Sequence, residues 1–91
     1  MLRITTKERP GSVTLVLEGR LCGAWTAEAE KAWLKLASTA EGQEVAVDLA
    51  GVTFVDKIGE AWLASILGQG AKVKSSGVWI SHIVHEVERR L

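Results

Sequence analysis

The chain has 91 residues, of which 47% are hydrophobic and 24% are charged, and its eleven basic residues are balanced by eleven acidic ones. This composition is sufficient for one hydrophobic core and argues against intrinsic disorder. The zero net charge argues against nonspecific binding to nucleic acid or to an anionic membrane surface. We therefore expect a single globular domain spanning residues 1–91 that does not bind nucleic acid.

The sequence also limits the compartment and the metal chemistry. No segment approaches the roughly 20 apolar residues of a membrane span, and the first residues lack the apolar stretch of a signal peptide. Cys22 is the single cysteine, so an internal disulfide is impossible and a structural zinc site would lack its usual thiolates. We expect a cytoplasmic protein without direct membrane insertion, metal or cofactor, in which Cys22 is a packed residue.

Two alternating segments open the chain. Leu2 and Ile4 alternate with polar residues, and a second alternation begins at Val13. Between them, Pro10 fixes φ and Gly11 accepts a positive φ, as the central positions of a type II turn require. The pattern predicts an antiparallel hairpin.

A helix is expected to follow from Thr26, whose hydroxyl can cap it, with Glu28 and Glu30 near the positive end of its dipole. The helical pattern fades at residues 38–42. The apolar face of this helix is predicted to consist of Ala29, Ala32, Trp33 and Leu36.

The middle of the chain combines a strand with a helix start. Residues 44–49 alternate again, and a tight turn at Gly51 is expected to separate them from a second apolar run at residues 52–55. Asp56 can then cap a helix by accepting a hydrogen bond from the backbone N–H of Ile58 or Gly59. A helix N-terminus of this kind exposes N–H groups and a positive dipole end.

The last third of the sequence predicts a helix, a strand and a helix. Apolar residues at helical spacing indicate a helix over Gly59–Ser75, followed by a short strand at Val78–Ser81 and a final helix over residues 84–91 in which Glu86 can pair with Arg90. An alternative places the strand at Ala71–Ser75.

These elements predict a small two-layer α/β domain. Its sheet would be mixed and four-stranded, with the N-terminal antiparallel hairpin followed by parallel strands, because right-handed crossovers place successive helices on one face. Polar residues on the opposite face of the strands favour a sheet that three helices cover mainly on one side. The uncovered face leaves room for a homodimer.

The order of these segments resembles the STAS family, the sulphate-transporter and anti-sigma-factor-antagonist domains. Residues 16–21 resemble the family's Leu-x-Gly-x-Leu, and residues 47–59 resemble its central signature, roughly Asp-Leu-x-x-Val-x-x-Ile-Asp-Ser-Ser-Gly. The similarity covers nearly the whole chain. It implies a noncatalytic domain that binds a protein partner through the loop and helix after the signature strand, and the candidate partner-binding residues are Asp56, Lys57, Ile58, Gly59 and Trp62.

Both hydroxyl positions of the signature are missing. The resemblance implies a role for one of these positions. In phosphorylation-regulated antagonists of the family, the serine before the glycine is phosphorylated by a partner kinase that is also the anti-sigma factor. Ile58 occupies that position here and has no oxygen that could accept a phosphoryl group, while Lys57 replaces the other hydroxyl residue. We therefore expect a docking surface that is permanently unphosphorylated at this position. Thr53 and Ser65 are other hydroxyl residues, although neither aligns with the acceptor serine.

Two branches of the family fit such a surface. One resembles the small STAS subunits of bacterial ABC lipid-transport systems, which bind the cytoplasmic ATPase. The other comprises anti-sigma-factor antagonists, which bind a kinase-like anti-sigma factor. A different class of function, a sensor of a small ligand or anion at the helix N-terminus, is the remaining alternative.

Structural interpretations compete with the functional ones. Asp56 can act simply as a cap, the tryptophans can be core residues, and the glycines can serve turn geometry. His82, His85 and Glu86 match neither zincin motif. No Ser-His-Asp order or P-loop is present, so we expect no enzymatic activity.

Overall fold

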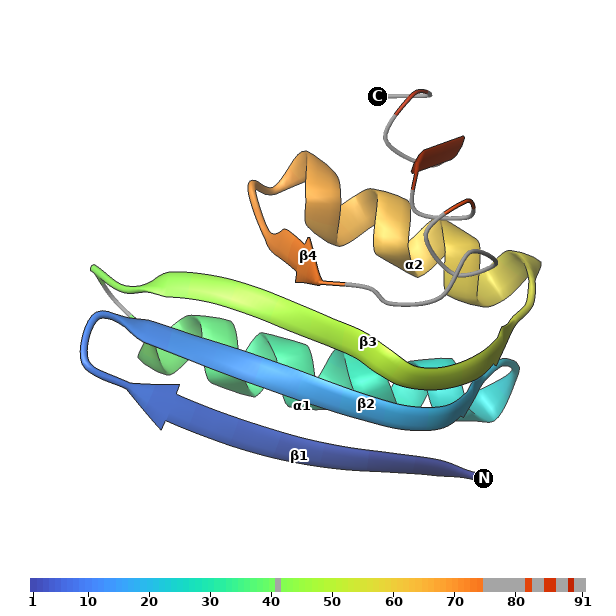
Figure 1. The fold of residues 1–91 in the computed structure, drawn as a ribbon, viewed down its shortest axis with the longest axis horizontal. Helices are drawn as coiled ribbons and strands as arrows, with labels where there is room; N and C mark the ends of the chain where they lie inside the picture. The colour runs from blue at the N-terminus through green and yellow to red at the C-terminus, as the bar shows by residue number, and fades with distance from the viewer. Residues whose placement is uncertain (41, 75–81, 83–84, 87–88, 90–91) are drawn as a thin grey trace.

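The computed structural model describes residues 1–40, 42–74, 82, 85–86 and 89. It shows a small α/β fold with a four-stranded mixed sheet in the order β1-β2-β3-β4, in which β1 is antiparallel to β2 and the other neighbours are parallel. Figure 1 shows α1 packed behind the strands and α2 following β3. The elements are β1 Leu2–Arg9, β2 Ser12–Leu21, α1 Ala24–Thr39, β3 Glu44–Val55, α2 Lys57–Gly68 and β4 Lys72–Lys74.

The N-terminal hairpin is confirmed. Arg9 pairs with Ser12, so Pro10 and Gly11 form a two-residue connection. Gly11 has φ 81°, a conformation that glycine adopts without the steric cost that a Cβ would bring. The hairpin places β2 in the middle of the sheet beside β3.

The core lies between one face of the sheet and the two helices. Alternate residues of β2 point into it, and both α1 and α2 contribute side chains to the same cluster. The largest fully buried side chains are Leu15, Leu17, Leu21, Leu49, Leu63, Ile66 and Val47. The opposite face of the sheet carries exposed charged residues on β1 and β4. Two-sided patterning of this kind was predicted from the strand sequences.

The expected tight turn at Gly51 is wrong, because β3 is one continuous strand through this residue. The register between β2 and β3 shifts twice, and β3 has one extra residue at each shift. These bulges rotate the strand, so that Leu49, Val52 and Val55 all face the core although they are three residues apart. The side chain of Asp48 supports the first bulge, since its Oδ1 accepts a hydrogen bond of 2.9 Å from the Ala50 N–H.

Helix α1 begins two residues earlier than predicted. Gly23 is its N-cap, without a side-chain cap, and the first turn contains no acidic residue. Thr26 therefore is not the cap; it is buried, and its hydroxyl has no hydrogen-bond partner among the described residues. Thr26 shares a helical face with Ala29 and Trp33, so packing determines its position. The predicted apolar face is confirmed, with Ala32 half-buried and the other three residues buried.

Helix α2 ends at Gly68, so the prediction of a helix as far as residue 75 is wrong. Gly70, with φ 92°, terminates it. The N–H of Gly70 donates to the Leu67 carbonyl and the N–H of Ala71 to the Ile66 carbonyl, which is the bonding pattern of a Schellman motif. The chain then forms β4, within the range of the alternative strand, and Val73 packs against the core.

Some predictions fall outside the described residues. These are the strand at Val78–Ser81 and most of the final helix over residues 84–91. The described part of the chain thus contains two of the three predicted helices, α1 and α2. Glu86 pairs with Arg89 at 3.2 Å, and the predicted partner Arg90 is not described. No helix among the described residues is long and apolar enough to cross a membrane.

Candidate functional site

Asp56 links the beginnings of the two helices. It is the N-cap of α2, as predicted, and its Oδ1 accepts a hydrogen bond of 2.8 Å from the Gly59 N–H. Its Oδ2 accepts a second bond of 3.0 Å from the N–H of Gly23, the N-cap of α1. One carboxylate thus fixes the loop after β3 against the loop after β2.

These bonds favour the charged form of the carboxylate. The hydrogen bond from Gly59, together with that from Gly23, holds the pKa of Asp56 below its ordinary value, although partial burial acts in the opposite direction. Asp56 is therefore an ionised structural group at neutral pH.

Gly59 is required by packing within the chain. A Cβ at this position would lie 2.5 Å from the Leu21 carbonyl oxygen and 2.9 Å from Val55 Cγ1. Gly59 is also buried, so it permits α2 to approach the end of β2 rather than offering a surface to a partner. This supports the structural interpretation of this residue.

Lys57 and Ile58 form the exposed part of the predicted site. Both belong to the first turn of α2, and the Ile58 side chain is 57% exposed. Asp56 holds the turn in place, so the isoleucine has a defined position on the surface. The structure therefore leaves a large apolar side chain in solvent beside a lysine.

Trp62 belongs to the core. It is 7% exposed and packs in the same cluster as Leu63 and Ile66. Trp62 is therefore close to the exposed loop in the sequence, but its side chain is buried and does not form part of the loop's surface. Trp33 is also buried, whereas Trp25 is 40% exposed, contrary to the packing role expected for it. Trp79 lies outside the described residues.

The sequence analysis missed further apolar residues at this end of the sheet. Phe54 is 37% exposed near the end of β3, and the Arg20 guanidinium lies 4.9 Å from its ring centroid. The Arg20 N–H donates to the carbonyl of Met1, which brings the N-terminus alongside. Figure 1 shows the N-terminus and the starts of α1 and α2 at the same end of the molecule. We call the exposed apolar residues at this end the end surface: Met1, Trp25, Phe54 and Ile58.

The end surface gathers most of the large apolar side chains that the described residues expose. Only Leu34, on α1, is an exposed large hydrophobic residue elsewhere in this part of the chain. The signal that could have revealed this surface is topological, because neighbouring parallel strands bring their carboxyl ends to one edge of a sheet. The residues after β2 and β3 therefore had to meet there.

No metal site is formed by the described residues. His82 and His85 are exposed, and no group of three potential ligands occurs in this part of the chain. Cys22 is a half-buried free thiol.

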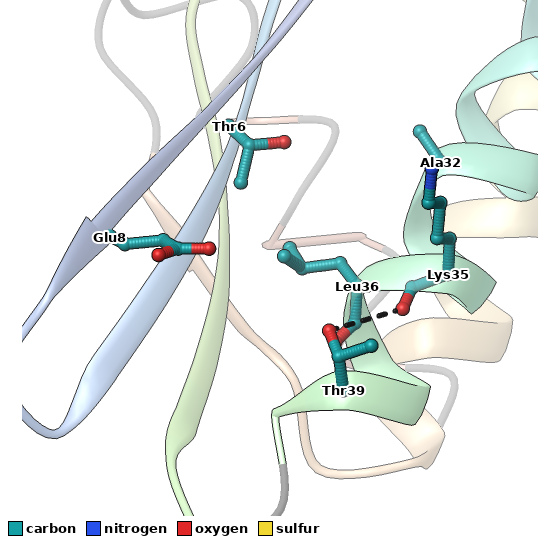
Figure 2. Close-up of a pocket in the computed structure, with 6 residues that line it drawn as sticks. All are labelled: Thr6, Glu8, Ala32, Lys35, Leu36 and Thr39. Atoms are coloured by element: carbon teal, nitrogen blue, oxygen red, sulfur yellow. Dashed lines mark hydrogen bonds between the residues drawn. The ribbon is translucent and has the colours of Figure 1, made fainter.

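A separate hollow lies between β1 and α1, toward the C-terminal end of that helix. Figure 2 shows Thr6 and Glu8 of β1 facing Leu36 and Thr39 of α1. Its volume is about 310 Å³. The Thr39 hydroxyl donates to the Leu36 carbonyl, so it is already engaged in the helix. The hollow lies far along α1 from Gly23 and forms no part of the end surface.

Comparison with known proteins assigns no family. No family model matches the chain, and no curated protein matches it. A crystal structure of Mglu in its native form is similar to it with 22% identity and a TM-score of 0.49, over 80% of this chain and 22% of that one. The native form of Mglu in 4.3 M NaCl gives 19% identity and a TM-score of 0.46, over 87% of this chain and 26% of that one. The chain thus spans about a quarter of the length of these proteins, and the likeness carries no functional argument.

Proposed function

We propose that this chain is a noncatalytic, STAS-like protein-interaction module of bacterial signalling or transport regulation, which binds a protein partner through the loop at the start of α2. The observation that carries the proposal is the exposure of Ile58, 57%, in a helical turn that Asp56 holds in place. A fixed apolar side chain beside a charged one is typical of a residue that becomes buried in an interface.

The chemistry of the loop favours binding over catalysis. Asp56 is committed to capping by its bonds to Gly59 and Gly23. Lys57 and Ile58 supply an amine and a hydrocarbon branch, which do not form a nucleophile paired with a general base. We infer that the chain works by docking.

The proposed docking surface is independent of phosphorylation at the family's acceptor position, where Ile58 stands. Thr53 has a hydroxyl close by in the sequence, but this hydroxyl donates to the Gly19 carbonyl at 3.2 Å. A surface that needs no phosphoryl group would bind its partner constitutively, in the manner of a scaffold subunit.

The resemblance to the STAS family suggests two cytoplasmic partners. One is the ATPase subunit of an ABC lipid-transport system, and the other is a kinase-like anti-sigma factor. The end surface has Arg20 over Phe54, and Lys57 and Glu60 in the first turn of α2, which favours a partner with an apolar pocket and charged residues of both signs around it.

An anion sensor at the start of α2 is less well supported. The Asp56 carboxylate already accepts the Gly59 N–H, which an added anion would need. An anion there would also meet the negative charge of Asp56.

The test is affinity capture from native cell lysate with the wild-type chain, Ile58→Asp and Leu34→Asp. Leu34 is a matched control because its side chain is also 57% exposed but lies on α1, outside the end surface. An aspartate in the first turn of α2 is compatible with the helix dipole, so Ile58→Asp should change the free energy of unfolding by less than about 0.5 kcal/mol.

We expect Ile58→Asp to lose a partner that wild type and Leu34→Asp retain. An ABC ATPase lost in this way selects the transport subunit, and a kinase-like protein selects the antagonist. Equal capture by all three chains would contradict docking through Ile58. Unfolding of Ile58→Asp would instead assign this side chain to the core.

A further inference from the structure

The open face of the sheet contains a basic hollow that the proposed docking function does not use. Its volume is about 210 Å³. All four strands contribute to it, and we call it the sheet hollow: Lys7, Arg9, Ser12, Thr14, Asp48 and Lys74.

The strand register explains why a hollow forms here. Arg9 is opposite Ser12, and Lys7 is opposite Thr14, which in turn is opposite Ala46 on β3. Short side chains therefore occupy the centre of this face, while long cationic ones rise from β1 and β4. The outer strands are roughly 14 Å apart, or three strand spacings, so their side chains can lean over the centre from both sides.

The charges of the sheet hollow are unbalanced. Three cationic side chains accompany one carboxylate, Asp48, in a chain with zero net charge. None of the ion pairs formed within the described part of the chain includes Lys7, Arg9 or Lys74. Lys72, by contrast, is paired with Glu44 at 3.6 Å. Asp48 lies directly opposite Lys74 in the register of β3 and β4, so this one carboxylate offsets one of the three positive charges. The remaining positive charges repel one another, and a bound anion would relieve this repulsion.

The donors suit a phosphate group. Arg9 offers a planar fork of N–H donors, Lys7 and Lys74 offer ammonium groups, and Ser12 and Thr14 offer hydroxyls. Asp48 would repel a bare phosphate, but its free oxygen can accept a hydrogen bond from a hydroxyl group of the ligand. Its Oδ1 already accepts the Ala50 N–H at 2.9 Å, which restrains the carboxylate among the lining residues of the hollow.

We propose that the sheet hollow binds a small phosphomonoester with a hydroxylated organic part, which is either a free metabolite or the headgroup of a lipid. The cations and hydroxyls hold the phosphate, and Asp48 holds a hydroxyl. The volume suits a ligand smaller than a typical drug-sized molecule. This inference does not depend on the docking function, because no residue of the end surface lines the hollow.

The first test is an NMR titration of the full-length chain with glycerol 3-phosphate, inorganic phosphate and glycerol. We expect the NMR chemical shifts of the residues that line the hollow to change saturably with glycerol 3-phosphate, and inorganic phosphate to bind at the same residues with lower affinity. Lys7→Ala/Arg9→Ala should weaken binding at least tenfold. The control Lys31→Ala/Lys35→Ala removes the same charge from α1 and should leave the affinity within about twofold of wild type, since these exposed lysines lie outside the hollow.

Asp48→Asn tests the division of roles. This variant should bind inorganic phosphate more tightly than wild type, because a repulsive charge is removed, and should lose most of the preference for glycerol 3-phosphate. Co-sedimentation with vesicles that contain phosphatidylinositol 4-phosphate, whose headgroup carries both a phosphomonoester and free hydroxyl groups, distinguishes the source of the ligand. Binding to vesicles alone that Lys7→Ala/Arg9→Ala abolishes would assign the site to a lipid headgroup. The proposal would be overturned if the chain bound neither glycerol 3-phosphate nor the vesicles saturably. It would also be overturned if Lys7→Ala/Arg9→Ala and Lys31→Ala/Lys35→Ala lost affinity equally.

Discussion

Gly59→Ala should destabilise the protein although alanine is the better helix former. At a compatible helical position, replacing glycine by alanine stabilises a protein by about 0.4–1 kcal/mol. At Gly59, however, the new methyl group would lie 2.5 Å from the Leu21 carbonyl oxygen and 2.9 Å from Val55 Cγ1. The carbonyl belongs to the backbone of β2 and cannot rotate away, so α2 must shift. Overpacking of this kind costs about 1–3 kcal/mol, which exceeds the gain.

Gly68→Ala is the matched control for this prediction. Gly68 lies in the same helix, and a Cβ there would have no atom within 4 Å. Its substitution should therefore be stabilising by up to about 1 kcal/mol. Urea unfolding of the three chains, followed by circular dichroism, gives the free energies of unfolding. We expect Gly59→Ala to be less stable than wild type by about 1–2 kcal/mol, which lowers Tm by several degrees for a domain of this size. Equal stabilisation by both substitutions would refute the packing argument.

Two further predictions concern the starts of the helices. Thr26→Val should raise the free energy of unfolding by about 1 kcal/mol, because valine keeps the shape of the side chain and removes a buried hydroxyl that has no hydrogen-bond partner among the described residues. Urea titrations measure this change. A loss of stability would mean that the Thr26 hydroxyl has a hydrogen-bond partner. The lowered pKa of Asp56 means that its carboxylate contributes stability at pH values above its ordinary pKa and loses it as the pH falls through the lower, folded-state pKa. Wild type should accordingly lose its stability advantage over Asp56→Asn as urea midpoints are followed below about pH 4, and parallel pH profiles would contradict this role.

Local signals predicted the parts of the fold that depend on neighbours in the sequence. Pro10 and Gly11 specified the hairpin, and the helical spacing of Ala29, Trp33 and Leu36 specified the buried face of α1. The capping of α2 by Asp56 was also predictable, since the cap and the Gly59 N–H are three residues apart. The end of α2 was mispredicted even though Gly70 carried the signal, because the apolar spacing continued past this glycine to Val73.

The features of the fold that the sequence did not predict depend on contacts between segments that are distant in the sequence. The bulges of β3 arise from its register with β2, so the continuous strand through Gly51 could not be distinguished from a turn. The bond from the Gly23 N–H to Asp56 joins residues 33 positions apart. The exposure of Trp25 and Phe54 likewise depends on which strands are neighbours. The candidate loop was therefore predictable, whereas the wider end surface was not.

The two proposed surfaces lie at different places along the same strands, and this separation makes their tests independent. Ser12 begins β2 and lines the sheet hollow, while Leu21 ends β2 and contacts Gly59. A strand rises about 3.3 Å per residue, so roughly 30 Å separates the two ends of β2. At this distance an exposed charge has little effect at physiological salt, because the Debye length is about 8 Å. Ile58→Asp should therefore leave phosphomonoester affinity unchanged, and Lys7→Ala/Arg9→Ala should leave partner capture unchanged. A variant that impaired both activities would indicate damage to the fold that carries them.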